Sequence, residues 1–118
     1  FPQLISRMPD PLTDQPLRVH FVPGTRLYTL MQAEESTEIF DCRYGLNSEW
    51  ENLFIGASLR IAARDDAGEV RALELVHHRF FYALLYEPER HALGGGVLHP
   101  IVEGFFKVAR SVRTAAKV

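Results

Sequence analysis

Residues 74–89 read ELVHHRFFYALLYEPE and contain the apolar run that decides the fold. This run, residues 80–86, is rich in aromatic side chains and lies between a charged segment and a Glu-Pro-Glu sequence. A short apolar run with polar boundaries is typical of a buried strand, not of a helix. Pro88 has no backbone N–H to donate to a strand ladder, so we expect the pairing to end near it. Glu87 and Glu89 then lie at the carboxyl end of a core strand, the edge where open α/β sheets bind ligands.

The length and composition indicate one globular domain or a part of one. The chain has 118 residues, and its hydrophobic content of 47% is ordinary for a globular protein. A formal net charge of −2 gives no basic surface for nucleic acid, and no apolar run is long enough to span a membrane. The single cysteine, Cys42, excludes an intrachain disulfide and favours a reducing, cytoplasmic location. Because the first residue is Phe1, we expect the chain to be part of a longer protein.

Four segments before the aromatic run predict further strands from their sequence pattern. Residues 17–22 predict a half-buried strand, and residues 38–42 predict a shorter one. Residues 58–64 and 69–76 flank the turn sequence Asp-Asp-Ala-Gly at 65–68, so we expect an antiparallel hairpin there. Together with the aromatic run that follows, this hairpin gives at least three strands in an antiparallel arrangement.

Three positions indicate the beginnings of helices. Thr25 is placed to cap a short helix that ends at residue 30 or 31, and Ser48 precedes a glutamate at capping-box spacing. Pro100 stands at a preferred first helical position. After it, apolar side chains recur at helical spacing, which predicts a long amphipathic helix: Ile101, Val102, Phe105, Phe106, Ala109 and Val112.

The chain divides into two parts by composition. Residues 1–16 contain four of the seven prolines and predict an irregular, proline-rich lead-in. Residues 17–118 predict the latter part of a mixed-sheet α/β domain with antiparallel hairpin strands and a long C-terminal helix. One amphipathic helix covers one face of a sheet, so we expect the other face to need residues that this chain lacks.

The sequence HRFFYALLYEPE at residues 78–89 resembles the H-P-x-F-x-x-x-Q-F-H-P-E segment of class I glutamine amidotransferases. The form closest to it is the C-terminal amidotransferase domain of CTP synthase, and a group related to that region, some members with selenocysteine, is similar too. Four further segments resemble parts of that domain, in the same order along the chain. Residues 23–25 resemble its P-G-S sequence, and residues 43–47 resemble its R-Y-E-V-N sequence. Residues 68–75 resemble its D-G-x-x-E-x-x-E-L hairpin, and residues 99–109 resemble its terminal S-P-L-F-x-G-F-x-x-A helix. The resemblance implies a three-layer, flavodoxin-like amidotransferase domain, of which this chain provides the C-terminal half.

Members of this family hydrolyse glutamine with a Cys-His-Glu triad through a glutamyl thioester. By this resemblance, Glu87 occupies the position of the triad histidine and Glu89 that of the orienting glutamate, so these are the predicted catalytic residues. A glutamate lacks the near-neutral titration of imidazole. The chain also has no G-x-C-x-G sequence, and Cys42 precedes the R-Y-E-V-N-like segment instead of lying on a strand-to-helix elbow. The departures imply that ordinary glutaminase chemistry is lost.

The resemblance leaves three functional hypotheses. The first is a CTP synthase-related pseudoenzyme in the lineage of pyrimidine nucleotide biosynthesis. The second is an active CTP synthase-type amidotransferase or hydrolase in which Glu87 and Glu89 supply altered acid–base chemistry. The third is a non-catalytic small-molecule binding or interaction module. The expected partners are a glutamine-like small molecule and either the N-terminal half of the same domain or another subunit, with no nucleic acid and no membrane.

The histidines do not indicate a metal site. His77 and His78 are adjacent in an extended segment, so their side chains point apart, and no third ligand stands at zinc-like spacing. We therefore predict no metal and no cofactor. The remaining three, His20, His91 and His99, are expected to be surface or capping groups.

Cys42, the triple glycine and the basic residues of the last helix favour structural roles. We expect a buried or half-buried structural thiol at Cys42, with Arg43 lowering its pKa and Asp41 raising it. Residues 94–96 are all glycine but lack the Lys-Ser/Thr of a phosphate loop, so they predict a flexible link. The basic side chains of the last helix are expected to face solvent: Lys107, Arg110, Arg113 and Lys117.

Overall fold

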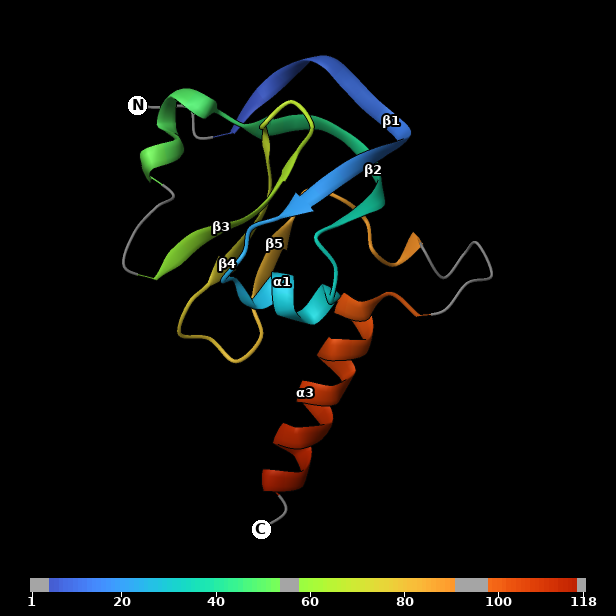
Figure 1. Ribbon diagram of the computed structural model, residues 1–118, viewed down its shortest axis with the longest axis vertical. Coiled ribbons are helices and arrows are strands. Elements are labelled where there is room, and N and C mark those ends of the chain that lie inside the picture. The colour runs from blue at the N-terminus through green and yellow to red at the C-terminus, as the bar shows by residue number, and fades with distance from the viewer. Residues whose placement is uncertain (1–4, 54–57, 91–97, 117–118) are drawn as a thin grey trace.

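The computed structural model describes residues 5–53, 58–90 and 98–116, which form a curled antiparallel sheet and three helical segments (Figure 1). The strands lie in the order β2-β1-β3-β4-β5, and all four pairings are antiparallel. They are β1 (Ile5–Phe21), β2 (Glu35–Leu46), β3 (Leu59–Asp65), β4 (Val70–Leu75) and β5 (Tyr82–Leu84). The helical segments are α1 (Arg26–Met31), a 3-10 helix (Ser48–Leu53) and α3 (Pro100–Ala116). The expected antiparallel strands and long C-terminal helix are confirmed.

Strand β1 is far longer than the strand expected at residues 17–22. It begins at Ile5 and pairs with β2 along most of its length, so most of the proline-rich residues expected to be irregular are extended. The pairing is interrupted between Arg7 and Leu12 and again between Leu12 and Gln15. Prolines are tolerated in strands at edges and bulges, and these interruptions lie in the proline-rich part. The strand expected at residues 38–42 is β2, which is also longer than expected because it pairs with the long β1.

The hairpin of β3 and β4 is confirmed, and a single aspartate organises its turn. Oδ1 of Asp65 accepts the backbone N–H groups of Ala67 and Glu69 at 2.9 and 3.0 Å. Gly68 has a φ of +83°, which favours glycine. At the start of the neighbouring 3-10 helix, Oδ1 of Asn47 accepts the N–H of Glu49 at 3.1 Å, while the side chain of Ser48, the predicted cap, is not among those that the structure describes.

The aromatic run at residues 80–86 is not a core strand, which corrects the central expectation about its position. Only Tyr82–Leu84 is a strand, and it lies at the edge of the sheet, paired with β4 alone. Phe81 is exposed, whereas Tyr86 is buried. The run is short because the chain leaves β4 after Leu85, whose N–H still bonds the carbonyl of Arg71, and crosses towards β2, where the N–H of Glu87 bonds the carbonyl of Ile39 at 3.0 Å.

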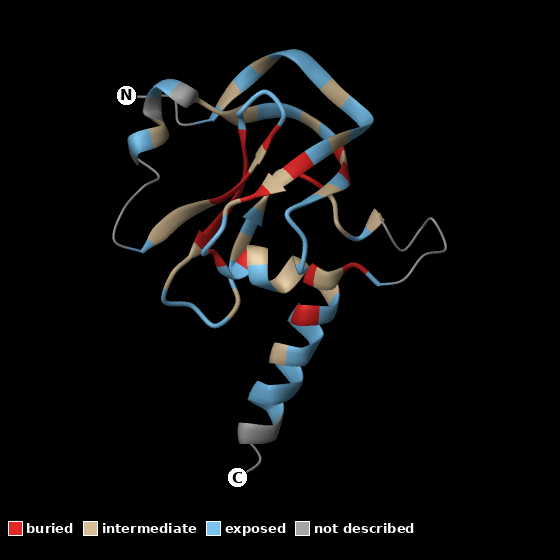
Figure 2. Ribbon diagram, in the orientation of Figure 1, coloured by how far each residue is buried: buried red, intermediate tan, exposed pale blue. Residues whose placement is uncertain are grey.

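The two α-helices meet at their ends near the sheet, and α3 then extends away from it (Figure 1). Thr25 caps α1 as expected, since its Oγ1 accepts the N–H of Tyr28 at 3.2 Å. At the beginning of α3, Ile101 and Gly104 are buried. Most of the helix beyond them is exposed (Figure 2), including Phe105 and Phe106. Within the described residues, no helix is both long and apolar enough to cross a membrane.

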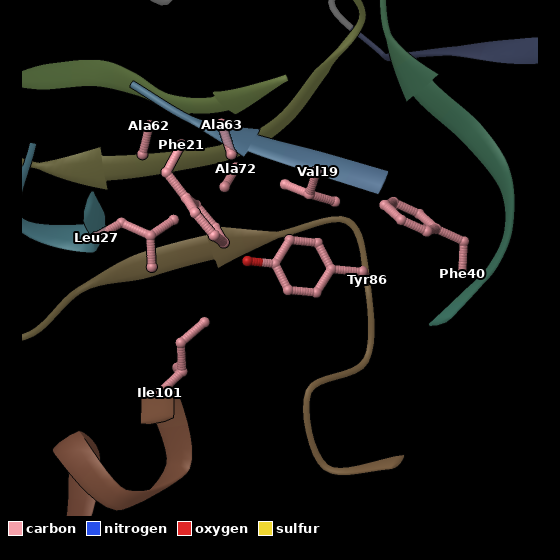
Figure 3. Close-up of a cluster of buried hydrophobic side chains, with 9 residues drawn as sticks. All are labelled: Val19, Phe21, Leu27, Phe40, Ala62, Ala63, Ala72, Tyr86 and Ile101. Carbon is pink, nitrogen blue, oxygen red and sulfur yellow. The ribbon is translucent and has the colours of Figure 1, made fainter. Parts of the chain in front are cut away.

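The core lies where β1, the hairpin and the segment after β5 meet the first turns of the helices (Figure 3). It combines large aromatic side chains with the small alanines of the hairpin, which let the layers approach closely. Its members are Val19, Phe21, Leu27, Phe40, Ala62, Ala63, Ala72, Tyr86 and Ile101. Three sequence predictions, for His91, for the triple glycine at 94–96 and for Lys117, lie outside the described residues.

Candidate functional site

The segment that carries the two predicted catalytic glutamates is anchored by its buried tyrosine. The ring of Tyr86 packs against Phe40 of β2 with 5.6 Å between centroids. One residue later, the N–H of Glu87 donates to the carbonyl of Ile39 at 3.0 Å. Side-chain packing and a backbone hydrogen bond therefore fix the start of the Glu-Pro-Glu sequence against β2.

The two glutamates have different surroundings. The side chain of Glu87 is 35% exposed, and its Oε2 lies 3.4 Å from Nη1 of Arg90. The same Nη1 also binds the carboxylate of Asp14 on β1, so Arg90 bridges two acidic side chains. Glu89 is exposed and makes no hydrogen bond or ion pair within the described part of the chain. Glu87 is thus held beside a guanidinium, while Glu89 faces solvent.

Cys42 is half-buried and lacks the surroundings of an activated nucleophile. Its Sγ lies 3.9 Å from Sδ of Met8. Burial raises the pKa of the Cys42 thiol above 9.0; Arg71 partly offsets this, whereas Asp41 and Glu87 raise it further. The expected effect of Asp41 is confirmed, while the cation that lowers the pKa is Arg71 instead of Arg43. At neutral pH this thiol is protonated, and a thiol is a weak nucleophile compared with a thiolate.

A buried glutamate–histidine pair close to this segment was not anticipated from the sequence. Nε2 of His99 lies 2.8 Å from Oε1 of Glu38, and both side chains are at most 5% exposed. Nδ1 of His99 accepts the N–H of Ile101 at 3.1 Å, so Nε2 carries the proton that is donated to Glu38. Of the two expected roles, surface or capping group, His99 has the second, and it is buried. The available signal was Glu38 two residues before Phe40, on the buried face of β2.

Next to this pair lies a buried phenol. Figure 3 shows the hydroxyl of Tyr86 directed into the cluster of core side chains. It has no hydrogen-bond partner among the described residues. Burial, followed by the negative charge of Glu38, raises the pKa of Tyr86 well above its ordinary value. This hydroxyl is therefore neutral at every physiological pH and is not a proton donor of ordinary acidity.

His77 and His78 are both exposed and do not form a metal site with other residues that the structure describes. Nδ1 of His78 accepts the N–H of Phe80 at 3.1 Å, and its ring meets Phe81 edge-on. The described residues contain no group of three or more histidine, cysteine or acidic side chains that could hold a metal ion.

Three cavities in the described part of the chain lie away from Glu87 and Glu89. One, of about 250 Å³, lies beside the starts of β1 and β4 and is lined by Arg7, Gly45 and Arg71 among others. A second, of about 360 Å³, lies between α1 and α3. The third, of about 530 Å³, follows the apolar side of α3. Neither glutamate lines any of these three cavities, so the predicted pair has no enclosed ligand space within them.

Comparison with known proteins points to one group. No protein-family profile matches the sequence. The chain is 32% identical over 85 residues to a CTP synthase from Cyanothece sp., a match that covers 71% of this chain and 15% of the relative. It is 29% identical over 94 residues to a CTP synthase from Synechocystis sp., a match that covers 79% of this chain and 17% of the relative. The chain therefore spans less than a fifth of the length of these relatives.

Two solved structures of similar fold are a CTPS glutaminase domain and a putative GMP synthase subunit. The CTPS glutaminase domain of Trypanosoma brucei, with bound acivicin, superposes with a TM-score of 0.76 at 19% identity over 92% of this chain and 46% of that domain. A putative GMP synthase subunit from Thermoplasma acidophilum superposes with a TM-score of 0.66 at 15% identity over 97% of this chain and 52% of that protein. The fold is that of about half of a class I glutamine amidotransferase domain, as the resemblance implied.

Proposed function

We propose that this chain is a CTP synthase-related amidotransferase-like protein whose ordinary glutaminase chemistry is degenerate. The single observation that carries the proposal is the sequence Tyr86-Glu87-Pro88-Glu89, in which a glutamate stands where the resemblance places the triad histidine. The similarity to CTP synthases and the amidotransferase fold support this alignment. A triad histidine takes the proton of the nucleophile at neutral pH, which a carboxylate, being far less basic than imidazole, does poorly.

The surroundings of the predicted residues favour loss of activity over altered acid–base chemistry. An acid–base pair needs two carboxylates in one enclosed site with different proton affinities. Glu87 instead binds Arg90, and Glu89 is exposed. Cys42, whose pKa is raised by burial, does not offer a thiolate as nucleophile. Among the described residues, these side chains therefore lack the arrangement that a hydrolase with altered chemistry would require.

A glutaminase assay on the full-length protein tests this proposal. We expect no release of ammonia from glutamine by the wild-type protein, and no covalent glutamyl adduct by mass spectrometry. The matched variants are Glu87→His, which restores the imidazole of the family, and Glu87→Ala, which removes the side chain. Ammonia release by the wild-type protein that Glu87→Ala abolishes and Glu87→His does not rescue would overturn degeneracy and favour the altered hydrolase.

We propose a glutamine-like small molecule as the ligand that such a protein retains. The support is that the solved neighbour is a glutaminase domain with bound acivicin. Isothermal titration of glutamine into the protein measures this separately from turnover. Heat of binding without ammonia release favours a binding module, whereas no heat at millimolar glutamine would contradict the proposed ligand.

The apolar side of α3 supports a protein partner, which we propose to be the first half of an amidotransferase domain. Phe105 and Phe106 are 53% and 55% exposed, and Phe105 lines the third cavity together with Phe80. Exposed apolar patches on one side of a helix mark contact surfaces. This chain corresponds to 46% of the glutaminase domain that it resembles, so a complementary half has the size to cover that side.

Mixing this chain with a separately produced first half of a CTP synthase glutaminase domain tests the proposed partner. We expect the amide hydrogens of α3 to become protected from exchange, and Phe105→Asp to remove that protection. Lys107→Asp is the matched control, because Lys107 is exposed and pairs with Glu103 of its own helix. Equal exchange with and without the added half would exclude this partner.

A further inference from the structure

The cavity beside the starts of β1 and β4 contains a buried guanidinium whose outer nitrogens have no partner within the described residues. Arg71 is 4% exposed, and its Nε donates to Oδ2 of Asp65 at 2.9 Å. Its guanidinium carbon also lies 5.2 Å from the centre of the Phe40 ring. These contacts fix the guanidinium plane but use neither Nη1 nor Nη2.

Asp65 is fully occupied in holding this arginine and its own turn. Oδ1 accepts the N–H groups of Ala67 and Glu69, while Oδ2 accepts Nε of Arg71. The aspartate cannot rotate to take a second hydrogen bond from the guanidinium without breaking the turn. The two Nη atoms of Arg71 are therefore preorganised donors, which is the geometry that binds carboxylate and phosphate oxygens in pairs.

The cavity lies directly in front of these donors. Gly45 of β2 forms part of its wall, and a Cβ at this residue would lie 3.9 Å from Nη1 of Arg71 and 3.6 Å from Cγ of Met8. A side chain longer than alanine at Gly45 would therefore enter the space beside Nη1. The volume of about 250 Å³ suits a ligand smaller than a typical drug.

Three charged side chains line the cavity, two arginines and one glutamate. Arg7 lines it, is exposed and has no ion pair within the described residues. Glu69 also lines it and offsets the charge of Arg7. The Arg71–Asp65 pair is neutral as a unit, so the preference for an anion depends on the Nη donors of Arg71 that Asp65 does not use, with Arg7 as a second cation at the cavity.

We propose that this cavity binds a small-molecule oxyanion, a carboxylate or a phosphate, through Nη1 and Nη2 of Arg71 with Arg7 at its entrance. Its lining includes neither Glu87 nor Glu89, so the site is independent of the proposed loss of glutaminase activity. Binding at this cavity is measured without ammonia release, which separates the two proposals experimentally.

Isothermal titration of sodium phosphate and of sodium succinate at constant ionic strength tests the site and distinguishes the two anion classes. We expect one of them to bind, and Arg7→Ala to weaken it about twofold to fivefold, as for a solvent-exposed charge. Arg18→Ala is the matched control, because Arg18 is an exposed arginine of β1 that does not line the cavity. Its affinity should equal that of the wild-type protein.

Substitution of Gly45 tests the inner part of the site without removing Arg71, whose loss would leave Asp65 unpaired. Gly45→Asp places a carboxylate beside Nη1 and should weaken the anion about tenfold or more. Gly45→Ala meets only ordinary contacts and should bind like the wild-type protein. No heat with either anion, an equal response to chloride, or unchanged affinity in Gly45→Asp would overturn the proposal.

Discussion

The imidazole of His99 joins β2 to the first turn of α3: Nε2 lies 2.8 Å from Oε1 of Glu38, and Nδ1 accepts the N–H of Ile101. Oε2 of Glu38 accepts a further hydrogen bond from Ser36. The next residue of β2, Ile39, binds the backbone of Glu87 through its carbonyl. The same short segment of β2 therefore positions both the C-terminal helix and the Glu-Pro-Glu sequence.

Replacing His99 by alanine should strongly destabilise the fold. The substitution leaves the carboxylate of Glu38 buried without its imidazole partner and removes the cap of α3. Leaving a buried carboxylate without its hydrogen-bond donor costs about 3 kcal/mol, and the lost cap adds about 1 kcal/mol. Urea unfolding monitored by circular dichroism measures the change in free energy of unfolding.

A double-mutant cycle separates the pair from the cap. Adding Glu38→Gln to His99→Ala should cost less than the two single changes together, because a buried neutral amide loses less than a buried carboxylate when the imidazole N–H is removed. His20→Ala is a suitable control, since His20 is 42% exposed and pairs with exposed carboxylates, and it should cost less than about 1 kcal/mol. If the changes in free energy of unfolding caused by Glu38→Gln and His99→Ala simply add in the double mutant, the two residues are not coupled.

Alkylation of Cys42 should be slow at neutral pH. Burial raises the pKa of the thiol above 9.0, so the reactive thiolate is scarce below that value and increases as the pH rises through it. Asp41→Asn removes a charge that raises this pKa and should accelerate the reaction with iodoacetamide at about pH 8. A rate that has already reached its plateau at neutral pH would show that the thiol is activated.

Replacing Tyr86 by phenylalanine should leave the stability at neutral pH unchanged within about 1 kcal/mol or increase it. Its buried hydroxyl has no partner among the described residues, so removing it loses no hydrogen bond there. The raised pKa of Tyr86 also determines the response to alkali. The unfolded chain ionises near the ordinary value of 10.0 while the folded chain does not, so stability is present below that pH and decreases above it.

The Tyr86→Phe protein should therefore lose less stability than the wild-type protein between neutral pH and about pH 10.5. Urea unfolding at the two pH values gives the difference. Tyr44→Phe is the control, because it removes the same hydroxyl from a side chain that is 55% exposed. If Tyr86→Phe and the wild-type protein lose the same free energy of unfolding between the two pH values, the phenol ionises equally easily in the folded and the unfolded chain.

Local patterns in the sequence predicted the hairpin, the Thr25 cap and the start of α3, because each depends on neighbouring residues. The edge position of β5 depends on a distant contact, the hydrogen bond between Glu87 and Ile39, which no local pattern contains. Apolarity alone therefore predicted a core strand where only Tyr86 is buried. The Glu38–His99 pair was missed for the same reason, since its partners are 61 positions apart.

Gly104 and Leu30 determine how closely α1 and α3 approach. A Cβ at Gly104 would lie 2.7 Å from Cδ1 of Leu30 and 3.4 Å from Cε2 of Phe80. Gly104→Val should therefore cost about 1–3 kcal/mol through overpacking, although any side chain also removes the flexibility of a helical glycine. Ala109→Val, at an exposed position of the same helix, controls for the poorer helix propensity of valine.

Shortening the opposing side chain should reverse part of this loss. Leu30→Ala alone creates space and destabilises the protein, whereas in the Gly104→Val background it relieves the clash and should recover free energy of unfolding. The two substitutions should thus be non-additive by about 1 kcal/mol or more, measured by urea unfolding of all four proteins. Additive effects would mean that α1 and α3 do not meet at these residues, and the placement of α3 against the sheet would then be wrong.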